Sequence, residues 1–308
     1  MKQLEINDTL PEDTRSIITV GNYDGVHCGH SMIMQTMVEQ AQKNNLTSIV
    51  ITFEPHTMRV LQSETPFEQL STFEEKKALL SKYRIDYILR VPFTESFRMI
   101  SQEDFIRTIM VQNLHAQEWC MGEGHNIGKD RGGKNNVLQN LLSKYHIVTF
   151  TADLMRQNDA IVSSTQIREN IAKGSVKDAV RMLGHPYLII SERIEGKKIG
   201  SQLGYPTLNF LRPPSQKVLP PSGVYAAELE YENEVQPGAL YFGDCPTFTD
   251  RKTHFEFHAL NANGTFPDIG KKARLWLHEF IRADHSFSSK EELIKQISCD
   301  ISKVKNYF

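Results

Sequence analysis

The ten residues GNYDGVHCGH place two histidines three positions apart, directly after a short β-branched run, Ser16–Val20. The motif begins at Gly21, and its glycines let a ligand approach the backbone closely. A helix that begins near Ser31 would direct its first N–H groups at an anion held in the turn. His27 and His30 can both donate hydrogen bonds to phosphate oxygens. The pattern therefore predicts a phosphate-binding site.

Two other interpretations of this motif are open. It is a solvated loop with two incidental histidines, or His27, Cys28 and His30 are zinc ligands. Zinc is less favoured because no downstream cysteine or histidine pair completes a tetrahedral set.

A second group of residues lies in the C-terminal part of the chain. Gly196, Gly200 and Gly204 recur at intervals of four and lead into the sequence Tyr-Pro-Thr-Leu-Asn. Glycines at this spacing are suited to a flap over phosphates. Thr207 and Asn209 would share one face of a strand, where a hydroxyl and an amide oxygen suit Mg²⁺. The alternative is an ordinary turn followed by a strand.

The stretch THFEFH, residues 253–258, alternates polar and aromatic side chains. In a strand, His254, Glu256 and His258 lie on one face. That face is either merely exposed to solvent or functional. A His–Glu–His metal site is a weaker alternative because it lacks a defined fourth ligand.

The first 185 residues alternate strand-like and helix-like segments, which favours a parallel sheet with helices on both faces. Expected strands are Ser16–Val20, Ser48–Phe53, Tyr87–Val91, Glu118–Met121 and Ile147–Phe150. Expected helices are Ser31–Lys43, Phe73–Tyr83, Glu103–Leu114 and Val137–Tyr145, followed by Ser164–Ala172 and Val176–Leu183 with a hinge at Gly174.

The pattern changes near residue 185, where prolines and glycines become frequent. Val224–Tyr231, Thr253–Leu260 and Arg274–His278 are typical of short antiparallel strands, and Ser289–Val304 of an amphipathic helix. We expect a small antiparallel β-barrel with a terminal helix. The predicted domains are residues 1–185 and 186–308.

Composition excludes several classes of protein. The formal net charge is −2, and neither half has a basic excess, which argues against a dedicated nucleic-acid binder. The polar start and the absence of a long apolar run predict neither a secretory signal nor a membrane partner. The four cysteines are isolated, so we expect a reducing, cytoplasmic setting.

The HxGH motif resembles the signature of the nucleotidyltransferase superfamily. GNYDGVHCGH is similar to the opening motif of prokaryotic bifunctional riboflavin kinase/FAD synthetases. Four further stretches resemble that family in order: Thr52–His56, Ser163–Arg168, Gly204–Asn209 and Thr253–His258. Together they span nearly the whole chain, and this resemblance implies a Rossmann-like first domain and a riboflavin kinase-like barrel.

For the first domain, the resemblance implies transfer of AMP from ATP to FMN, with Mg²⁺, giving FAD and pyrophosphate. His27, His30 and Arg168 are the catalytic candidates. The nucleotide-binding candidates are Gly21, Asn22, Asp24, Gly25, Ser163, Ser164 and Thr165. Glu54 and His56 end a strand at the expected ligand edge, although a turn before Pro55 also accounts for them.

For the second domain, the resemblance implies phosphorylation of riboflavin by ATP. Thr207 and Asn209 would bind Mg²⁺ with ATP beneath the glycine flap. Glu256 would act as general base on the riboflavin 5′-hydroxyl. Arg282 and Phe287 belong to a segment that contacts flavin in the family.

The sequence departs from the family pattern at several positions. Gly124 stands where the first domain usually has Asp or Asn, and Asn126 is a candidate flavin contact in its place. Cys245 replaces a usual arginine, and Asp284 a usual glutamate. The alternatives to a bifunctional enzyme are therefore a chain that keeps one of the two activities, or a non-catalytic regulator that binds flavin or nucleotide.

Overall fold

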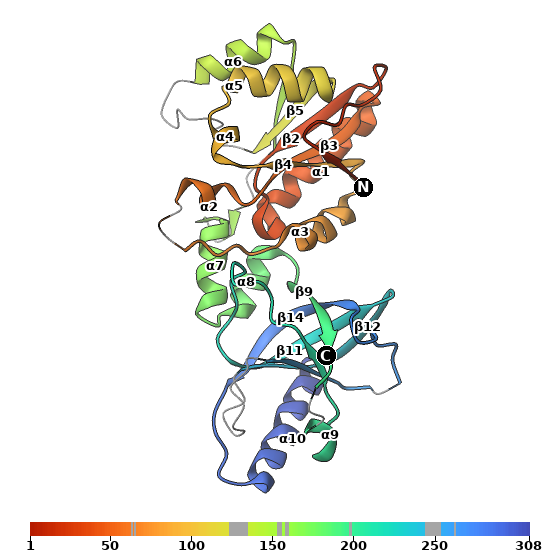
Figure 1. Ribbon diagram of the computed structural model, residues 1–308, viewed down its shortest axis with the longest axis vertical. Coiled ribbons are helices and arrows are strands. Elements are labelled where there is room, and N and C mark those ends of the chain that lie inside the picture. The colour runs from red at the N-terminus through yellow and green to blue at the C-terminus, as the bar shows by residue number, and fades with distance from the viewer. Residues whose placement is uncertain are drawn as a thin grey trace. The chain divides into compact units, whose positions relative to one another are not determined.

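The computed structural model describes residues 1–62, 64, 66–122, 135–152, 156–157, 160–196, 199–243, 254–261 and 263–308 (Figure 1). The chain forms two units. The first contains Met1–Gln69 and Lys76–Ser163, and the second contains Leu70–Glu75 and Ser164–Phe308. The division between residues 185 and 186, which assigns one activity to each side, stays a prediction.

The first unit contains a parallel sheet of six strands in the order β1-β4-β3-β2-β5-β6. The strands are β1 (Lys2–Glu5), β2 (Ser16–Val20), β3 (Thr47–Glu54), β4 (Tyr87–Pro92), β5 (Ala116–Gly122) and β6 (Val148–Ala152). The chain proceeds outward from β2 to β4 and then returns to the other side of β2 at β5. The carboxyl ends of β2 and β5 therefore flank the point where the strand order reverses, which is the usual ligand edge of such sheets.

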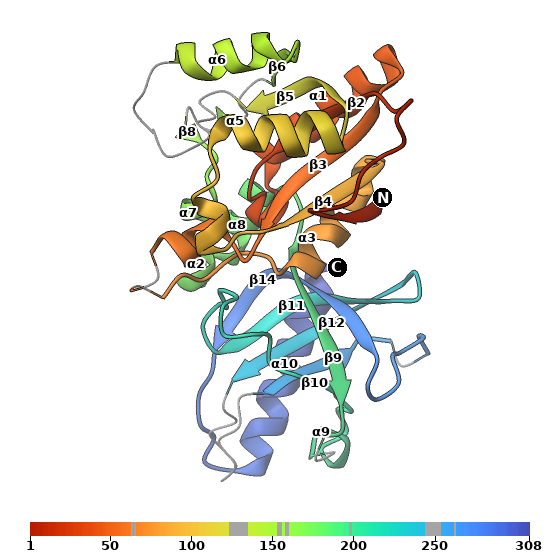
Figure 2. The same ribbon diagram turned by 45° about the horizontal axis from the view of Figure 1, so that its top comes forward.

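Helices connect these strands and cover both faces of the sheet (Figure 2). They are η1 (Asp24–Val26), α1 (Cys28–Asn44), α2 (Thr57–Leu61), α3 (Phe73–Leu80), η2 (Ser81–Tyr83), α4 (Glu95–Arg98), α5 (Gln102–Asp104), the π-helix η3 (Phe105–Asn113) and α6 (Asn135–Lys144). The sheet face that carries Ile18 and Ile49 packs against Ile106 and Met110 of η3. A two-stranded hairpin follows, β7 (Arg156–Gln157) and β8 (Ala160–Ile161). The expected parallel α/β fold is confirmed.

The second unit contains a closed antiparallel barrel in the order β10-β13-β12-β11-β14-β9. Its strands are β9 (Tyr187–Ile194), β10 (Leu208–Phe210), β11 (Gly223–Tyr231), β12 (Glu234–Gly243), β13 (His254–Ala259) and β14 (Lys272–Ala283). The aromatic rings of Tyr225, Phe255 and Phe257 are fully buried. The expected barrel is confirmed.

Among its described residues, the second unit also has the helices α7 (Ser164–Ala172), α8 (Val176–Leu183), α9 (Ile199–Gln202) and the terminal α10 (Lys290–Tyr307). Helix α10 begins at the cap Ser289, whose hydroxyl accepts from the Glu292 N–H at 3.1 Å. Its Val304 packs against Val224 and Ala226 of the barrel. The terminal helix expected from the sequence is therefore confirmed.

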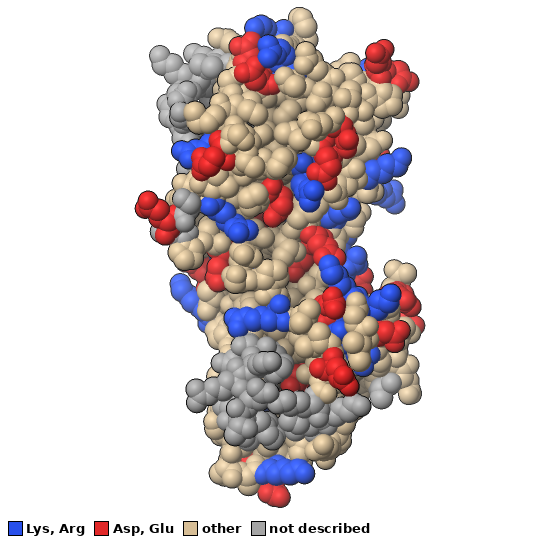
Figure 3. All heavy atoms as spheres, viewed as in Figure 1, with Lys and Arg blue, Asp and Glu red and all other residues tan. Residues whose placement is uncertain are grey.

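Charged side chains of both signs are interspersed on the face that Figure 3 shows. Most ion pairs among the described residues join partly exposed side chains, and such pairs contribute little to stability. The pair between Glu75 and Lys217 differs, because their side chains are 1% and 0% exposed.

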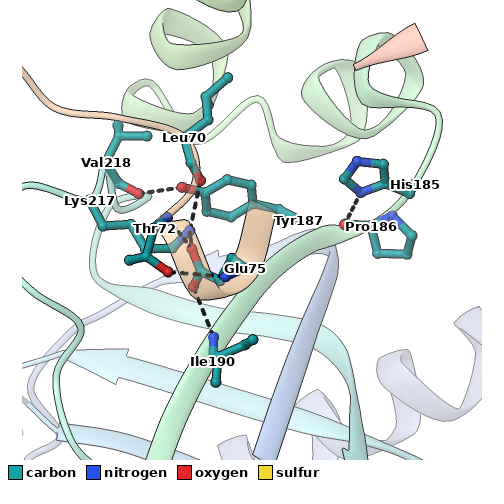
Figure 4. A network of polar contacts seen from close by, with 9 residues as sticks. All are labelled: Leu70, Thr72, Glu75, His185, Pro186, Tyr187, Ile190, Lys217 and Val218. Atoms are coloured by element: carbon teal, nitrogen blue, oxygen red, sulfur yellow. Dashed lines mark hydrogen bonds and ion pairs between the residues drawn. The ribbon is translucent and has the colours of Figure 1, made fainter. Parts of the chain in front are cut away.

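Glu75 satisfies several buried groups of the second unit at once (Figure 4). Its carboxylate accepts from the Lys217 ammonium at 2.8 Å and from the Ile190 N–H at 2.9 Å. It also closes a capping box with Thr72 at the start of α3, where each residue bonds the other's backbone N–H. Lys217 donates in addition to the Leu70 carbonyl at 2.7 Å and lies over the Tyr187 ring. These contacts bind residues 70–75 to the second unit.

Replacing Glu75 by glutamine should destabilise the second unit by about 3–5 kcal/mol, because the Lys217 ammonium would stay buried without a counter-charge. The matched control is Glu74→Gln. Its carboxylate pairs with Lys272 in the same unit, but both side chains are half exposed, so we expect a loss below about 1 kcal/mol. Urea unfolding followed by Trp276 fluorescence in a Trp119→Phe background measures both, since the chain has two tryptophans. Equal losses of unfolding free energy in the two variants would contradict the importance of the buried Glu75–Lys217 pair.

Candidate functional site

The turn between β2 and α1 has an unusual backbone. Tyr23, Gly25 and Val26 have φ values of 48°, 74° and 42°. Gly25 adopts this conformation without strain, whereas a tyrosine or a β-branched valine in the left-handed region costs about 1–3 kcal/mol. Such a turn persists only where surrounding contacts hold it.

The Tyr23 ring provides one such contact. It is 3% exposed, and its hydroxyl lies 2.6 Å from the Thr19 hydroxyl. Thr19 donates its hydrogen to the Cys120 carbonyl at 2.8 Å, so Tyr23 is the donor to Thr19. Burial raises the pKa of Tyr23 well above its ordinary value, so the phenol stays protonated. A Cβ on Gly21 would lie 2.9 Å from this ring, which explains the glycine.

The histidine pair lies at the N-terminus of α1. The helix begins at Cys28 rather than near Ser31, so His27 is the N-cap and His30 lies within the first turn. The two imidazole rings stack, with centroids 3.6 Å apart and planes 20° apart. The rings of Tyr23 and His30 form a T-shaped contact, with centroids 5.1 Å apart. The sequence prediction that the histidines lie together at a helix start is correct, and only the helix boundary was wrong.

Asn22 connects this turn to the neighbouring strand and helix. Its side-chain amide donates to the Thr57 hydroxyl at 2.8 Å, and its amide oxygen accepts from the Thr57 N–H at 3.3 Å. Its backbone carbonyl accepts from the Thr52 hydroxyl at 3.2 Å. Asn22 therefore shapes the turn. Asp24 is 2% exposed in η1.

The stretch Thr52–His56 has a structural role at its last residue. His56 is the N-cap of α2, and its Nδ1 accepts from the Met58 N–H at 3.2 Å. Its ring stacks on Phe67 at 4.5 Å. Glu54 ends β3. For His56, these contacts support the alternative that it terminates the strand and starts a helix.

The β2–α1 turn is suited to an anion. It lies at the carboxyl end of a central parallel strand and at the start of a 17-residue helix, where the backbone dipoles favour negative charge. A phosphate bound there would accept hydrogen bonds from imidazole N–H groups and from the first backbone N–H groups of α1. The arrangement therefore favours binding of a polyphosphate.

The predicted phosphate ligands of Ser163–Arg168 lie at the start of α7. Ser163 precedes the helix, and Ser164, Thr165 and Arg168 share its first turns. The Arg168 guanidinium donates to the Ser164 carbonyl at 3.3 Å and to the Thr165 hydroxyl at 3.2 Å. The structure brings these three residues together, and their contact with a phosphate stays a prediction.

In the barrel, Thr207, Asn209 and Glu256 lie together. Asn209 pairs directly with Glu256 across strands β10 and β13. The Thr207 hydroxyl donates to a Glu256 carboxylate oxygen at 3.1 Å. Because the hydroxyl hydrogen points at Glu256, the lone pairs of Thr207 face other directions and can bind a cation.

The glycines before β10 lie against these side chains. A Cβ on Gly196 would meet the Asn209 amide nitrogen at 2.1 Å. A Cβ on Gly200 would lie 2.4 Å from the Tyr205 carbonyl oxygen and 3.2 Å from the Thr207 hydroxyl. Gly204 has φ +86° and open space around it. Gly196 and Gly200 therefore let the backbone lie close to Asn209 and Thr207, and Gly204 permits a turn with positive φ.

The candidate flavin contacts of the second unit, Arg282 and Phe287, lie close to each other. Arg282 donates to Asp300 of α10 at 2.8 Å, and its guanidinium lies 5.7 Å from the Phe287 ring centroid. Asp284 accepts from the Tyr241 hydroxyl at 2.9 Å. Asn126, with the departures at Gly124 and Cys245, lies outside the described residues.

Among the described residues, no group of three or more His, Cys, Asp or Glu side chains is placed to hold a metal ion. His27, Cys28 and His30 belong to the described residues, so the zinc alternative for them is wrong. The His254 side chain lies outside the described part of the structure, so the His–Glu–His alternative stays a prediction.

The two halves of the chain match two protein families. Residues 9–166 match the family described as FAD synthetase, and residues 183–308 match riboflavin kinase. The chain belongs to the bifunctional riboflavin kinase/FMN adenylyltransferase family. It is 33% identical over 301 residues to the protein of that name from Buchnera aphidicola of Schizaphis graminum, covering 96% of this chain and 95% of the relative.

Other family members are similarly related. The Escherichia coli K12 protein is 29% identical over 293 residues, covering 95% of this chain and 92% of its own length. The Bacillus subtilis protein is 29% identical over 299 residues, covering 96% and 94%. A solved Streptococcus pneumoniae structure, titled a macrolide-efflux protein, covers 99% of both chains with a TM-score of 0.85. At 22% identity, it supports the fold alone. Within the described part of this family member, no helix is both long and apolar enough to cross a membrane.

The rate at which Cys120 reacts should measure how well β5, the strand next to β2, is buried. Burial raises the pKa of Cys120 on β5 to about 12 and raises that of the half-buried Cys28 as well. Cys120 therefore remains a thiol at pH 8 and should resist iodoacetamide, whereas the exposed Cys299 should react well before Cys120. Peptide mass spectrometry of timed samples of the native protein measures the order. Labelling of Cys120 as fast as Cys299 would contradict the buried strand.

Proposed function

We propose that this chain makes FAD from riboflavin in two ATP-dependent steps. The second unit transfers the γ-phosphoryl group of ATP to riboflavin and forms FMN. The first unit transfers AMP from ATP to FMN and releases pyrophosphate. The observation that carries the proposal is the presence, in one chain, of the stacked His27–His30 pair and the Thr207–Glu256 pair, each within the matching family half.

In the first unit, an FMN phosphate oxygen attacks the α-phosphorus of ATP, and negative charge develops on the departing pyrophosphate. His27 and His30 would donate to those oxygens, and the start of α1 adds backbone dipoles. Gly21, Gly25 and the Asn22 contacts keep the backbone close to the nucleotide, and Asp24 lies in the same turn. Ser163, which ends the first unit, and Ser164, Thr165 and Arg168, which begin the second, stay candidate phosphate ligands from the sequence.

In the barrel, Glu256 would accept the proton of the riboflavin 5′-hydroxyl as that oxygen attacks the γ-phosphorus. The Thr207 hydroxyl donates to the Glu256 carboxylate at 3.1 Å and would hold it in place for this role. Gly196, Gly200 and Gly204 would cover the phosphates. Arg282 and Phe287 would contact the flavin ring, with Asn126 as a contact in the first unit.

Enzymes of both classes use ATP, typically with a divalent metal, and we propose Mg²⁺ here. The donor set fits, because Thr207 and Asn209 present neutral oxygens beside the Glu256 carboxylate. When bound, the ion would neutralise charge on the ATP phosphates. We also propose a cytoplasmic setting, which the isolated cysteines favour.

A time course from riboflavin, ATP and Mg²⁺, resolved by HPLC, tests both steps at once. We expect FMN to appear first and FAD to follow. FMN without FAD would indicate a chain with kinase activity alone, and flavin binding without turnover would indicate a regulator. Either result would contradict the bifunctional proposal.

Single substitutions should separate the two steps. Glu256→Gln should slow FMN formation by about 10²–10⁴-fold, the usual contribution of a general base, and leave FAD formation from supplied FMN intact. His30→Ala should slow FAD formation by about 10²–10³-fold and leave riboflavin phosphorylation intact. Parallel assays with riboflavin and with FMN measure this, and loss of both activities in either variant would contradict the assignment.

Gly200→Ala should lower kcat/KM for riboflavin phosphorylation by about tenfold or more, because the new Cβ would displace the Tyr205 carbonyl and with it Thr207. Gly270→Ala in the same unit is the control for general destabilisation, because its Cβ would enter open space while its φ of +84° makes the alanine strained. It should lower stability without a matching loss of kcat/KM. FMN adenylylation in the same samples should be unchanged. An unaffected kinase activity would show that the close contact between Gly200 and the Tyr205 carbonyl is not needed for phosphorylation.

A further inference from the structure

Lys76 is a buried lysine of the first unit that neither the sequence motifs nor the proposed mechanism uses. It lies on α3 and is 2% exposed. Its ammonium donates to the Thr52 hydroxyl at 3.0 Å. A lysine buried to this degree is rare unless its charge has partners.

The hydrogen bond from Lys76 sets the direction of the next one. An ammonium group only donates, so Thr52 must accept from Lys76 and use its own hydrogen elsewhere. That hydrogen goes to the backbone carbonyl of Asn22 at 3.2 Å. Lys76, Thr52 and Asn22 thus form a directed chain that ends on the first residues of the β2–α1 turn.

Charge supports the same connection. Burial lowers the pKa of Lys76, while the nearby carboxylates of Asp24 and Glu54 favour its charged form. Asp24 is itself 2% exposed and lies three residues before His27. The ammonium therefore offsets part of the negative charge of these carboxylates beside the histidines.

The turn needs such support because of its backbone. Tyr23 and Val26 adopt left-handed φ values, which are unfavourable for these residue types. Tyr23 is held through Thr19, and Asn22 is held through Thr52. Loss of the Thr52 hydrogen bond would release the Asn22 carbonyl, and of the described side-chain contacts only the bonds to Thr57 would then hold Asn22. We expect the turn and the histidines that follow it to shift. A displacement of about 1 Å is enough to lower catalysis by about 10²-fold.

We propose that Lys76 is a positioning residue for FMN adenylylation. Its ammonium orients the Thr52 hydroxyl onto the Asn22 carbonyl and compensates Asp24, so that the β2–α1 turn presents His27 and His30 to the ATP phosphates. The proposal rests on the adenylyltransferase function proposed above for the first unit.

The test compares Lys76→Met, Thr52→Val, Thr52→Ser and the double variant Lys76→Met/Thr52→Val. For FAD formation from FMN, we expect kcat to fall by about tenfold or more in Lys76→Met and Thr52→Val. Thr52→Ser keeps the hydroxyl and should stay within threefold of the unmodified protein. The double variant should be little worse than the poorer single variant, because both changes interrupt one chain of hydrogen bonds.

Riboflavin phosphorylation in the same samples is the internal control and should change less than threefold in every variant. If Lys76→Met does not fold, the near-isosteric Val and Ser variants at Thr52 decide alone. FAD formation within twofold of the unmodified protein in a folded Lys76→Met or in Thr52→Val, or an equal loss in Thr52→Ser, would overturn the proposal. Absence of FAD formation in the unmodified protein would instead overturn the adenylyltransferase function, and the inference with it.

Discussion

The β2–α1 turn must hold a backbone that its own residues do not favour. Tyr23 and Val26 lie in the left-handed region, so their conformation depends on buried contacts outside the turn. Those contacts are polar and come from the strands on either side of β2: the Cys120 carbonyl through Thr19, and the Thr52 hydroxyl. The stacked histidines follow directly on this turn, at the start of α1.

In the barrel, glycines rather than strained residues allow the backbone to lie close to the candidate site residues. Strand β10 has three residues, and Asn209 within it pairs with Glu256. Gly196 and Gly200 come close enough that any side chain would meet Asn209 or the Tyr205 carbonyl. Close backbone approach places a hydroxyl, an amide and a carboxylate within one small region. Both sites therefore combine a rigid strand with a neighbouring loop whose conformation is tightly limited.

Helix α3 has two consecutive buried charges with different partners. Glu75 is satisfied by Lys217 and the Ile190 N–H within the second unit, and Lys76 by Thr52 within the first. Successive residues of an α-helix point about 100° apart, so one turn of helix can direct a carboxylate and an ammonium to separate sets of groups. Loss of Glu75 would leave the Lys217 ammonium buried without its counter-charge, and loss of Lys76 would remove the donor to the Thr52 hydroxyl.

Local patterns were sufficient for the class of fold and for most chemistry-bearing motifs. The HxGH spacing, the glycines at intervals of four and the polar alternation around Glu256 all depend on residues near one another in the chain. The alternation of strands and helices likewise predicted a parallel sheet, and the shorter alternating runs a barrel. Periodicity is a local property, so it is readable without knowing which segments meet.

Tertiary structure decided what local patterns do not carry. Strand β1 is a polar segment that becomes a strand by pairing with β4, and β10 is too short to show a period. The start of α1 at Cys28 follows from the turn that Thr19 and Thr52 hold. Lys76 follows a glutamate in an ordinary helical segment, and nothing nearby in the chain marks it. Its role arises because Thr52, 24 residues away, meets it in the buried interior, and a pairing between distant residues is specified only when the whole unit packs.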